Sequence, residues 1–462
     1  MKRIFTAFLT VMLCAGLIPH AGASEAVGTM RVGLHYGNGV LNEASISNAD
    51  GAGFTAGCYD GRNFVSRTTI SDTRLRVTAS GSTITVSDAG TGAAVYTGTD
   101  SNLALRPNGE QIVCQEHNYK GDIVFTASGG QLTVMNYVSL EDYVRGVLPY
   151  EMTPSWPTEA LKAQAVCARS YALSSVNKHQ SRYGFDVCDG TDCQVYQGTT
   201  RATGQSDSAV QATEGEYLVH NGKLAAGYFF SSDGGATEDA VNVWGNEIGY
   251  LKGVPDPYED LDNAANGRWS KTLTASEVAE KLRSAGYSIG TVKNISITKR
   301  TPMDNVNEVT ITDTAGSKVV LKRQACRAVF NVNSIRYSIN GDSGAAPEKS
   351  ESSSNSNTSA TSNPTNTTET QPQPQQPSTV YISGTSALGP APRFSVGALG
   401  ALNPLYYIGA SYFATTTSFT FTGTGWGHNV GMSQYGAKGM AEQGFNYREI
   451  LSYYFTDIEI SK

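Results

Sequence analysis

Glu151 has neighbours in the sequence that could tune its carboxyl group to act as an acid or a base. It sits between Tyr150 and Met152, and Trp156 lies five residues further along. Apolar neighbours can exclude water from a carboxyl group and raise its pKa, which keeps a proton available near neutral pH. Cleavage of a glycosidic bond needs such a proton at the leaving oxygen. A carboxylate near a helix N-terminus can also be structural, a duty for which Glu159 is better placed.

Two predicted helices surround this carboxyl group. Ser139 and Asp142 form an S-x-x-D start signal for a short helix over residues 143–148. Pro149 is expected to end that helix, because proline lacks the N–H that helix continuation needs. A connection then leads into a longer helix, rich in Ala, Leu, Lys and Gln, that runs to about Val176.

The longer helix carries two cations that point the same way. Lys162 and Arg169 are seven residues apart and therefore share a face two turns from each other. Val166 lies between them, which is unusual for a freely solvated face. Two ordinary surface charges would give the same spacing, so this pattern alone does not decide between substrate binding and solvation.

Four blocks, in order, resemble the signature of the stage II sporulation protein D (SpoIID)/LytB family. They run from Tyr143 to Ala172, from Cys193 to Tyr196, from Phe230 to Gly235, and from Gly425 to Ala437. Four ordered blocks are a more specific signal than one short motif. The resemblance covers about residues 137–258 and 419–455, and it leaves the N-terminal part and residues 379–418 uncovered.

The resemblance implies a peptidoglycan lytic transglycosylase that remodels the cell wall, with sporulation as one such process, and that acts on glycan strands stripped of stem peptides. It implies that Glu151 is the acid/base. One carboxyl group suffices because the sugar's own C6 hydroxyl attacks the anomeric carbon at high effective molarity. The candidate substrate-binding residues are Lys162, Arg169, Tyr171, Ser231, Asp233, His428 and Gln434. For His428 the alternative is a structural histidine that bonds the loop backbone.

The same family implies a second reading. Its LytB branch is similar to wall-binding proteins that enhance a cell-wall amidase without cutting glycan. In that case Glu151 would be structural and the groove would only bind sugar. Release of soluble fragments from purified wall, with no amidase added, would distinguish the two readings.

Cys188 and Cys193 raise the question of zinc, which members of this family can carry at this loop with Cys and His ligands. The nearest upstream histidine, His179, lies beyond Arg182 and Gly184. Two thiolates without a histidine partner make a weak tetrahedral site. A local disulfide between Cys188 and Cys193 is the alternative, since disulfides persist in exported proteins. We therefore predict no metal and no cofactor.

The start of the sequence predicts export to the cell wall or beyond. Lys2 and Arg3 precede an apolar run over residues 4–18, and Ala21 and Ala23 form a small-x-small cleavage signal. An uncleaved anchor is the alternative. No later stretch is apolar and long enough to cross a bilayer. The net charge of −7 argues against a nucleic-acid partner, which proteins usually meet with a basic face.

The composition predicts an α+β protein in several parts. A signal peptide over 1–23 is followed by a β-rich domain over 24–130, with alternating runs broken by Gly, Asn and Asp. A mixed α/β core follows over 131–343. Residues 344–378 are nearly all polar, and we expect a disordered insert there. Residues 379–462 are expected to complete the core.

Overall fold

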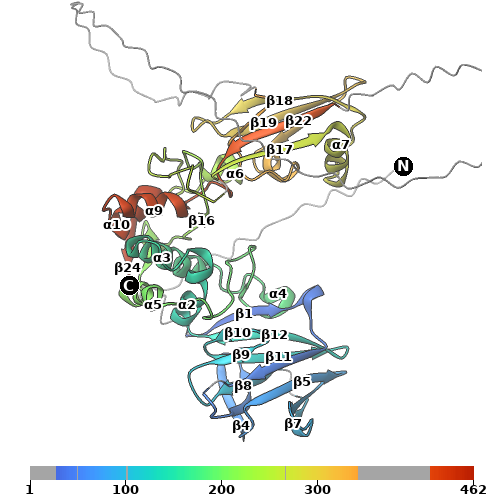
Figure 1. Ribbon diagram of the computed structural model, residues 1–462, viewed down its shortest axis with the longest axis vertical. Coiled ribbons are helices and arrows are strands. Elements are labelled where there is room, and N and C mark those ends of the chain that lie inside the picture. Colours follow the sequence, from blue (N-terminus) through green and yellow to red (C-terminus); the bar gives the residue numbers. More distant parts are fainter. Residues whose placement is uncertain (1–27, 49, 100–101, 266, 342–416) are drawn as a thin grey trace, which may run out of the picture. The chain divides into compact units, whose positions relative to one another are not determined.

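The computed structural model describes residues 28–341 and 417–462, except residues 49, 100–101 and 266. The expected signal peptide and the expected insert over 344–378 lie outside the described residues. The predicted α+β class is confirmed, because helices and several separate sheets alternate irregularly along the chain (Figure 1). No helix of the described residues is long and apolar enough to cross a membrane.

The N-terminal part consists of two sheets that share a core. One has the order β13-β1-β12-β11-β8-β3-β4, and the other β10-β9-β2-β5-β6-β7. Side chains from both sheets belong to one buried apolar cluster, as expected for strands with one face buried. The strands are β1 (Met30–His35), β2 (Glu43–Ser47), β3 (Phe54–Asp60), β4 (Asn63–Ile70), β5 (Arg74–Ser80), β6 (Thr83–Asp88), β7 (Ala94–Gly98), β8 (Leu103–Pro107), β9 (Ile112–Cys114), β10 (His117–Tyr119), β11 (Asp122–Ser128) and β12 (Gln131–Val138), with a 3-10 turn at Gly37–Gly39.

The β-rich part extends past the predicted limit at residue 130. Strand β12 forms a hairpin with β11 and also pairs with β1, so the sheet continues to Val138. The short strand β13 (Val187–Cys188) pairs with β1 in parallel and joins the same sheet. The loop that carries the cysteines is thereby fixed to the edge of the N-terminal sheet.

Helix α2 (Leu140–Glu151) begins where the sequence predicts. The Ser139 Oγ accepts a hydrogen bond from the Asp142 N–H at 3.1 Å, which confirms the start signal. The prediction that Pro149 ends the helix is wrong, because the helix continues to Glu151. Pro149 removes only its own N–H bond, while the Met152 N–H still closes the last turn on Leu148 O at 3.0 Å.

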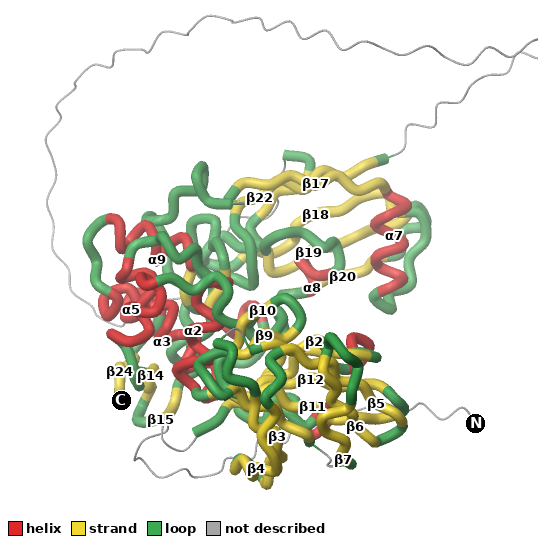
Figure 2. The backbone as a smooth tube through the Cα atoms, turned by 60° about the horizontal axis from the view of Figure 1, so that its bottom comes forward, coloured by secondary structure: helices red, strands yellow, loops and turns green. Residues whose placement is uncertain are grey.

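Helix α3 (Thr158–Ser174) is buried on most of its surface and lies against α2, α5, α9, α10 and β14 (Figure 2). Such all-round burial explains why its sequence is rich in alanine on several faces. The neighbouring elements are α4 (Gln180–Tyr183), α5 (Gly204–Ala212), β14 (Tyr217–His220), β15 (Lys223–Leu224), β16 (Phe229–Phe230) and α6 (Ala240–Val243).

A second apolar cluster is separate from the first. It gathers side chains of β17 and β22, the hairpin strands β18 and β19, and helix α7. The buried apolar residues of the predicted single core over 131–343 therefore belong to more than one hydrophobic cluster. The elements are β17 (Arg268–Thr274), α7 (Ala275–Ser284), β18 (Val292–Arg300), β19 (Val306–Asp313), β20 (Lys318–Lys322), α8 (Ala325–Ala328) and β21 (Tyr337–Ile339).

The C-terminal segment adds one strand to each of three sheets. Strand β22 (Ser418–Thr424) lies between β17 and β21, and β23 (Met432–Ser433) pairs with β16 in parallel. Strand β24 (Ile458–Ser461) pairs with β14. Helices α9 (Gln434–Glu442) and α10 (Tyr447–Tyr454) lie against α3. Residues 417–462 thus pack into both apolar clusters.

Candidate active site

A pocket of about 170 Å³ lies at the C-terminal end of α2. Segments far apart in the sequence form its walls: the end of α2, the residue after β16, and the start of α9. Its lining residues are Glu151, Thr153, Trp156, Ser231, Ala265, Trp426, Gln434 and Tyr435.

The Glu151 carboxyl group is held on both of its oxygens. Oε1 accepts a hydrogen bond from the Val195 N–H at 2.7 Å, and Oε2 accepts one from the Gln434 amide at 3.3 Å. Burial raises the pKa of Glu151, while these two donors act in the opposite direction. The result is a carboxyl group that retains its proton more readily than an exposed glutamate and is still stabilised after losing it.

Packing against α2 positions the Val195 donor. The Gln194 amide, buried beside it, donates to the Tyr143 hydroxyl at 3.2 Å. The Tyr196 ring stacks on the Tyr143 ring at 5.0 Å. At Gly146, an added Cβ would lie 2.3 Å from Tyr196 Cε2, so only glycine lets the ring approach the helix this closely. The backbone N–H between these two anchored side chains is therefore held facing Glu151.

Parallel pairing of β16 and β23 brings Gln434 and Ser231 to the pocket. The Tyr435 N–H donates to the Ser231 carbonyl oxygen at 3.0 Å. The Ser433 Oγ caps α9 by accepting the Gly436 N–H at 3.2 Å, which sets Gln434 as the first residue of the helix. Both side chains were predicted to bind substrate, and both line the pocket.

Aromatic rings form much of the pocket wall. Trp156 and Tyr435 meet edge to face at a centroid distance of 4.8 Å. Trp426 is 42% exposed, which is unusual for a tryptophan. Flat, partly apolar rings beside polar groups suit the faces and hydroxyl groups of a sugar.

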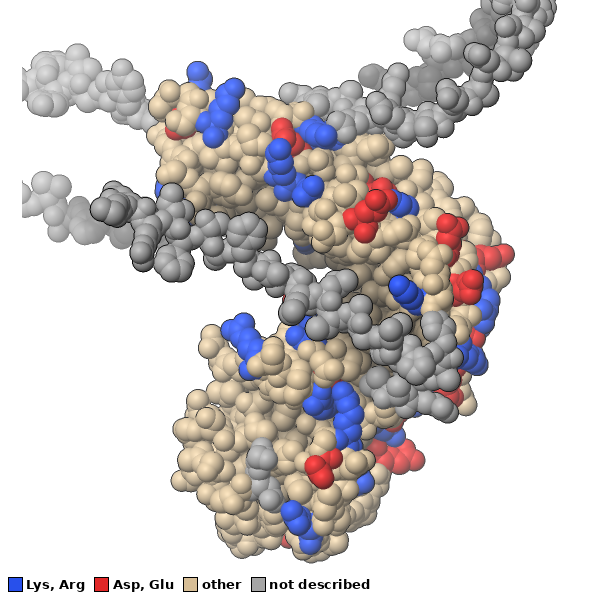
Figure 3. All heavy atoms as spheres, turned by 180° about the vertical axis from the view of Figure 1, so that it is seen from behind, with Lys and Arg blue, Asp and Glu red and all other residues tan. Residues whose placement is uncertain are grey.

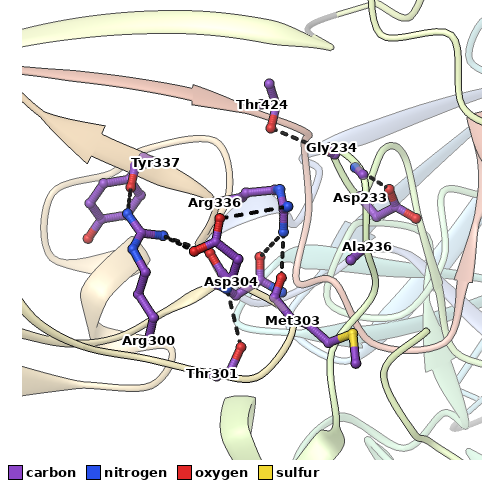
Figure 4. A network of polar contacts seen from close by, with 12 residues as sticks. Asp233, Gly234, Ala236, Arg300, Thr301, Met303, Asp304, Arg336, Tyr337 and Thr424 are labelled. Atoms are coloured by element: carbon purple, nitrogen blue, oxygen red, sulfur yellow. Dashed lines mark hydrogen bonds and ion pairs between the residues drawn. The ribbon is translucent and has the colours of Figure 1, made fainter. Parts of the chain in front are cut away.

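Asp233 does not reach the pocket. It is fully buried, and its Oδ1 accepts the Gly235 N–H at 2.7 Å. Burial and the adjacent carboxyl groups of Asp256 and Glu259 raise the pKa of Asp233 well above its usual value, so it holds a proton. Figure 4 shows that the same turn is linked to β22, because the Thr424 hydroxyl donates a hydrogen bond to the Gly234 carbonyl oxygen at 2.9 Å. Asp233 thus shapes the turn that follows Ser231.

Arg169 is also buried inside the protein rather than exposed to a substrate. Its side chain is fully buried, and its guanidinium group forms two hydrogen bonds to Glu141, at 2.8 and 2.7 Å. A third bond goes to the Glu216 carbonyl oxygen at 2.9 Å. The expectation that Arg169 contacts substrate does not fit this burial, because the guanidinium group is enclosed and hydrogen-bonded to protein oxygens.

Three further candidates lie outside the pocket lining. Lys162 pairs with Glu159 on the helix surface at 2.7 Å. The Tyr171 hydroxyl donates to the Asp192 carbonyl oxygen at 3.3 Å. His428 packs between two aromatic rings, and its Nδ1 accepts the Val430 N–H at 3.1 Å. Burial lowers the pKa of His428 to about 4, so it is a neutral, structural histidine.

The cysteine loop differs from what the spacing suggested. His179 Nε2 lies 3.3 Å from Cys193 Sγ and 3.2 Å from Asp192 Oδ2. The ligand atoms of these three residues and of Cys188 lie within 4.8 Å of one another. Gly184, with φ of 87°, follows the four-residue helix α4 as its C-cap. The chain turns back there, so that the His179 N–H donates to the Asp186 carbonyl oxygen at 3.2 Å.

These donors fit zinc. Two sulfur atoms, one imidazole nitrogen and one carboxylate oxygen form a set typical of tetrahedral zinc. With all four positions from the protein, zinc would tie the loop together two residues before Val195. The sequence spacing suggested that no histidine lies near the two thiols, but His179 does lie beside them. The prediction that no metal binds stays untested. Both thiols are free in the described residues.

Comparison with known proteins relates part of the chain to one family. A model of the SpoIID family, described as stage II sporulation protein, matches residues 128–220. This segment is a SpoIID domain. The resemblance seen in the four sequence blocks is therefore confirmed. The SpoIID domain contains Glu151 and its donor Val195, whereas Ser231, Trp426 and Gln434 come from outside the matched range.

Relatives of the chain extend beyond the SpoIID domain. An uncharacterized protein of Brachyspira hyodysenteriae is 40% identical over 179 residues, which are 39% of this chain and 47% of that protein. The amidase enhancer of Bacillus subtilis is 29% identical over 333 residues, 68% of this chain and 39% of the enhancer. Stage II sporulation protein D of the same organism is 27% identical over 342 residues, 70% of this chain and 75% of that protein. The chain thus spans less than half of the first two relatives.

The structure brings together three of the predicted site residues and adds others, among them a backbone donor that the sequence did not indicate. Glu151, Ser231 and Gln434 meet at the pocket. The Val195 backbone N–H was missed, because a backbone donor has no residue-type signature. Its only sequence signal was its place inside the block from Cys193 to Tyr196.

Proposed function

We propose that this protein cleaves peptidoglycan glycan strands as a lytic transglycosylase, with Glu151 as its single acid and base. One observation carries the proposal: among the described residues that line the pocket, Glu151 is the only carboxyl group. Glycoside hydrolases usually place two carboxyl groups roughly 5–10 Å apart, one of them for water or for a covalent intermediate. A transglycosylase needs one, because the nucleophile belongs to the substrate.

In the first step, protonated Glu151 donates its proton to the glycosidic oxygen. The bond between the anomeric carbon and this oxygen breaks, the leaving sugar departs with a new hydroxyl group, and positive charge develops on the remaining sugar. The raised pKa of Glu151 keeps the acid form available for this step. The hydrogen bonds from Val195 and Gln434 then stabilise the carboxylate that forms.

In the second step, the Glu151 carboxylate takes the proton of the C6 hydroxyl of the same sugar. The C6 oxygen bonds to the anomeric carbon and closes a 1,6-anhydro ring. Glu151 is again protonated, and no water is consumed. Trp156 and Tyr435 could hold the sugar in position for this ring closure, since they form one wall of the pocket.

The test is product analysis of purified peptidoglycan, both intact and stripped of peptides, after incubation with the wild-type protein or Glu151→Gln. Anhydro-muramyl ends from the wild type alone are expected. Reducing ends would contradict the mechanism, because they require water as the nucleophile. The matched control is Glu159→Gln, a carboxyl group that pairs with Lys162 outside the pocket lining and should keep full cleavage.

A second candidate function is favoured by the similarity to the amidase enhancer. In this reading the chain binds wall glycan through the aromatic pocket and stimulates an amidase, and Glu151 is structural. Both candidates place the protein outside the cytoplasm, at the cell wall, with glycan strands as its partner. Binding by both proteins without cleavage by either would favour the enhancer.

A further inference from the structure

A second pocket adjoins the Glu151 pocket. It has a volume of about 310 Å³ and is lined by Trp269, Ser270, Lys271, Arg327, Asn331, Val332, Asn333 and Trp426. The exposed indole of Trp426 lines both pockets. The backbone also joins them, since the Gly427 N–H donates to the Asn333 carbonyl oxygen at 3.0 Å. A polymer held beside Glu151 can therefore extend over Trp426 into the second pocket.

Two cations face this second pocket without an acidic partner. Arg327 Nε donates to the Asn333 carbonyl oxygen at 3.0 Å, and Lys271 Nζ donates to the Asn331 carbonyl oxygen at 2.7 Å. In the described part of the chain, neither group forms an ion pair. Glu277 and Lys281 are the charged groups that influence Lys271, and they act on it in opposite directions.

Burial disfavours the charged form of both side chains, and a bound anion would offset this effect. It lowers the pKa of Arg327, with no neighbouring carboxylate to offset it, and it also lowers the pKa of Lys271. A partly buried cation without a counter-charge is unfavourable, and an incoming anion removes that cost. Arg327 has further N–H groups beyond Nε, which can grip a carboxylate in a two-pronged geometry.

Other basic side chains nearby differ from these two. Arg268 pairs with Asp262 at 2.7 Å, and Arg336 lies 4.0 Å from Asp304. Figure 3 shows Lys and Arg interspersed with Asp and Glu over the face drawn there. The whole chain carries a net charge of −7. Unpaired cations in this pocket are thus a local feature rather than part of a general basic surface.

The chemistry of the wall polymer supplies a matching anion. Each muramic acid carries a lactyl group, whose carboxylate is free when the stem peptide has been removed. When the peptide is present, this carboxyl group is an uncharged amide and leads into a bulky chain. Only a stripped strand therefore presents an anion next to the sugar ring.

We propose that Arg327 and Lys271 bind the lactyl carboxylate of a peptide-free muramoyl residue of the strand in the second pocket, beside the Glu151 pocket. This inference rests on the proposed function and explains how the same site selects stripped strands. Arg169, one of the substrate-binding candidates from the sequence, is enclosed in the core and cannot supply this contact.

The test measures binding by the full chain carrying Glu151→Gln, which keeps the sugar intact. Titration calorimetry compares a muramic-acid tetrasaccharide with free carboxylates and the same tetrasaccharide with its carboxyl groups converted to methylamides. We expect about tenfold weaker binding of the methylamide, as one charge-assisted contact is worth roughly that factor. Adding Arg327→Gln should remove the preference, so that both sugars bind alike.

Two controls guard against misfolding. Arg268→Gln removes a nearby exposed cation that already has a partner, and it should keep the tenfold preference. Arg327→Lys retains the positive charge and should restore part of the preference. Equal binding of the two sugars before Arg327 is changed would overturn the proposal. So would an equal loss of both sugars in a folded Arg327→Gln protein.

The two proposals fail separately. A preference for the free carboxylate, together with no cleavage by the wild type, would support the second pocket and contradict the transglycosylase. Anhydro products without any preference would do the opposite. The binding measurement on Glu151→Gln does not depend on catalysis, so each result bears on one proposal only.

Discussion

At the scale of single residues, Glu151 is balanced between two influences. Burial disfavours its charged form, and the Val195 and Gln434 donors favour it. A group that must give a proton and then take one benefits from both, since neither form is too stable to leave. His428, which sequence reasoning grouped with it, has a lowered pKa and is not one of the residues that line the pocket.

Glu151→Gln should abolish cleavage and stabilise the folded protein increasingly as pH rises. The folded pKa lies above the unfolded value of ~4.3, so the folded state binds the proton more tightly and loses stability as pH rises between the two values. The glutamine of the variant does not titrate, so the stability of the variant lacks this pH dependence. Thermal melts of both proteins across this range check the prediction.

A stability difference that stays constant with pH would contradict that prediction. Cleavage by the wild type should fall as pH rises through the pKa of Glu151, because the acid form is needed in the first step. A cleavage rate that rises there instead would argue that Glu151 acts as a base first.

At the scale of elements, helix α2 is fixed at both ends. Its first turn carries Glu141, which receives Arg169 from α3, and its last residue is Glu151. The Tyr143 and Gly146 face between them packs against the loop that supplies Val195. The position of the proposed catalytic carboxyl group therefore depends on contacts made along the whole helix.

Arg169→Met should destabilise the protein by about 3 kcal/mol, because it leaves Glu141 partly buried without its cation. Substrate affinity of the protein that remains folded should change little. Chemical denaturation and binding measurements check the two parts. Lys162→Met is the matched control, and the loss of its more exposed pair should cost less than about 1 kcal/mol.

Gly146→Ala should destabilise the protein by roughly 1–3 kcal/mol and lower kcat/KM, because the new methyl group pushes on the Tyr196 ring. Displacement of this ring moves the adjacent Val195 N–H away from Glu151. Adding Tyr196→Leu, which makes room for the methyl group, should recover part of the stability. Unchanged activity in Gly146→Ala would show that the loop does not support the carboxyl group.

At the scale of the whole molecule, the C-terminal segment completes structures begun some 200 residues earlier. The Gln434 amide reaches a carboxyl group 283 positions away in the sequence. Strands β22, β23 and β24 each pair with strands of the middle segment. Apolar residues of the segment, among them Phe421, Met432 and Leu451, are fully buried.

A chain that ends at residue 343 should therefore fail to fold, because it leaves three sheets without a strand and exposes both apolar clusters. Circular dichroism and thermal melts check this. As a control, a protease site placed within 344–378 of the full chain, once cut, should leave the two pieces associated on size-exclusion chromatography. A stable, active truncated chain would refute the prediction.

The sequence by itself determined the features that depend on neighbours along the chain. The start of α2 follows from a Ser139 cap three residues from its donor, and strands such as β6 follow from alternation, because both are local effects. Glu151 could be singled out because its apolar neighbours and its motif are contiguous.

Only the tertiary structure decided which side chains meet across long separations. Arg169 finds Glu141 28 residues away, and His179 finds Cys193 14 residues away across a tight turn. Spacing reveals which face of a helix a residue occupies, but not what covers that face. For this reason the sequence did not reveal that Arg169 is buried away from the pocket or that His179 lies beside the cysteines. Nor did it reveal that Arg327, which forms no ion pair with the described residues, lines a pocket with Trp426.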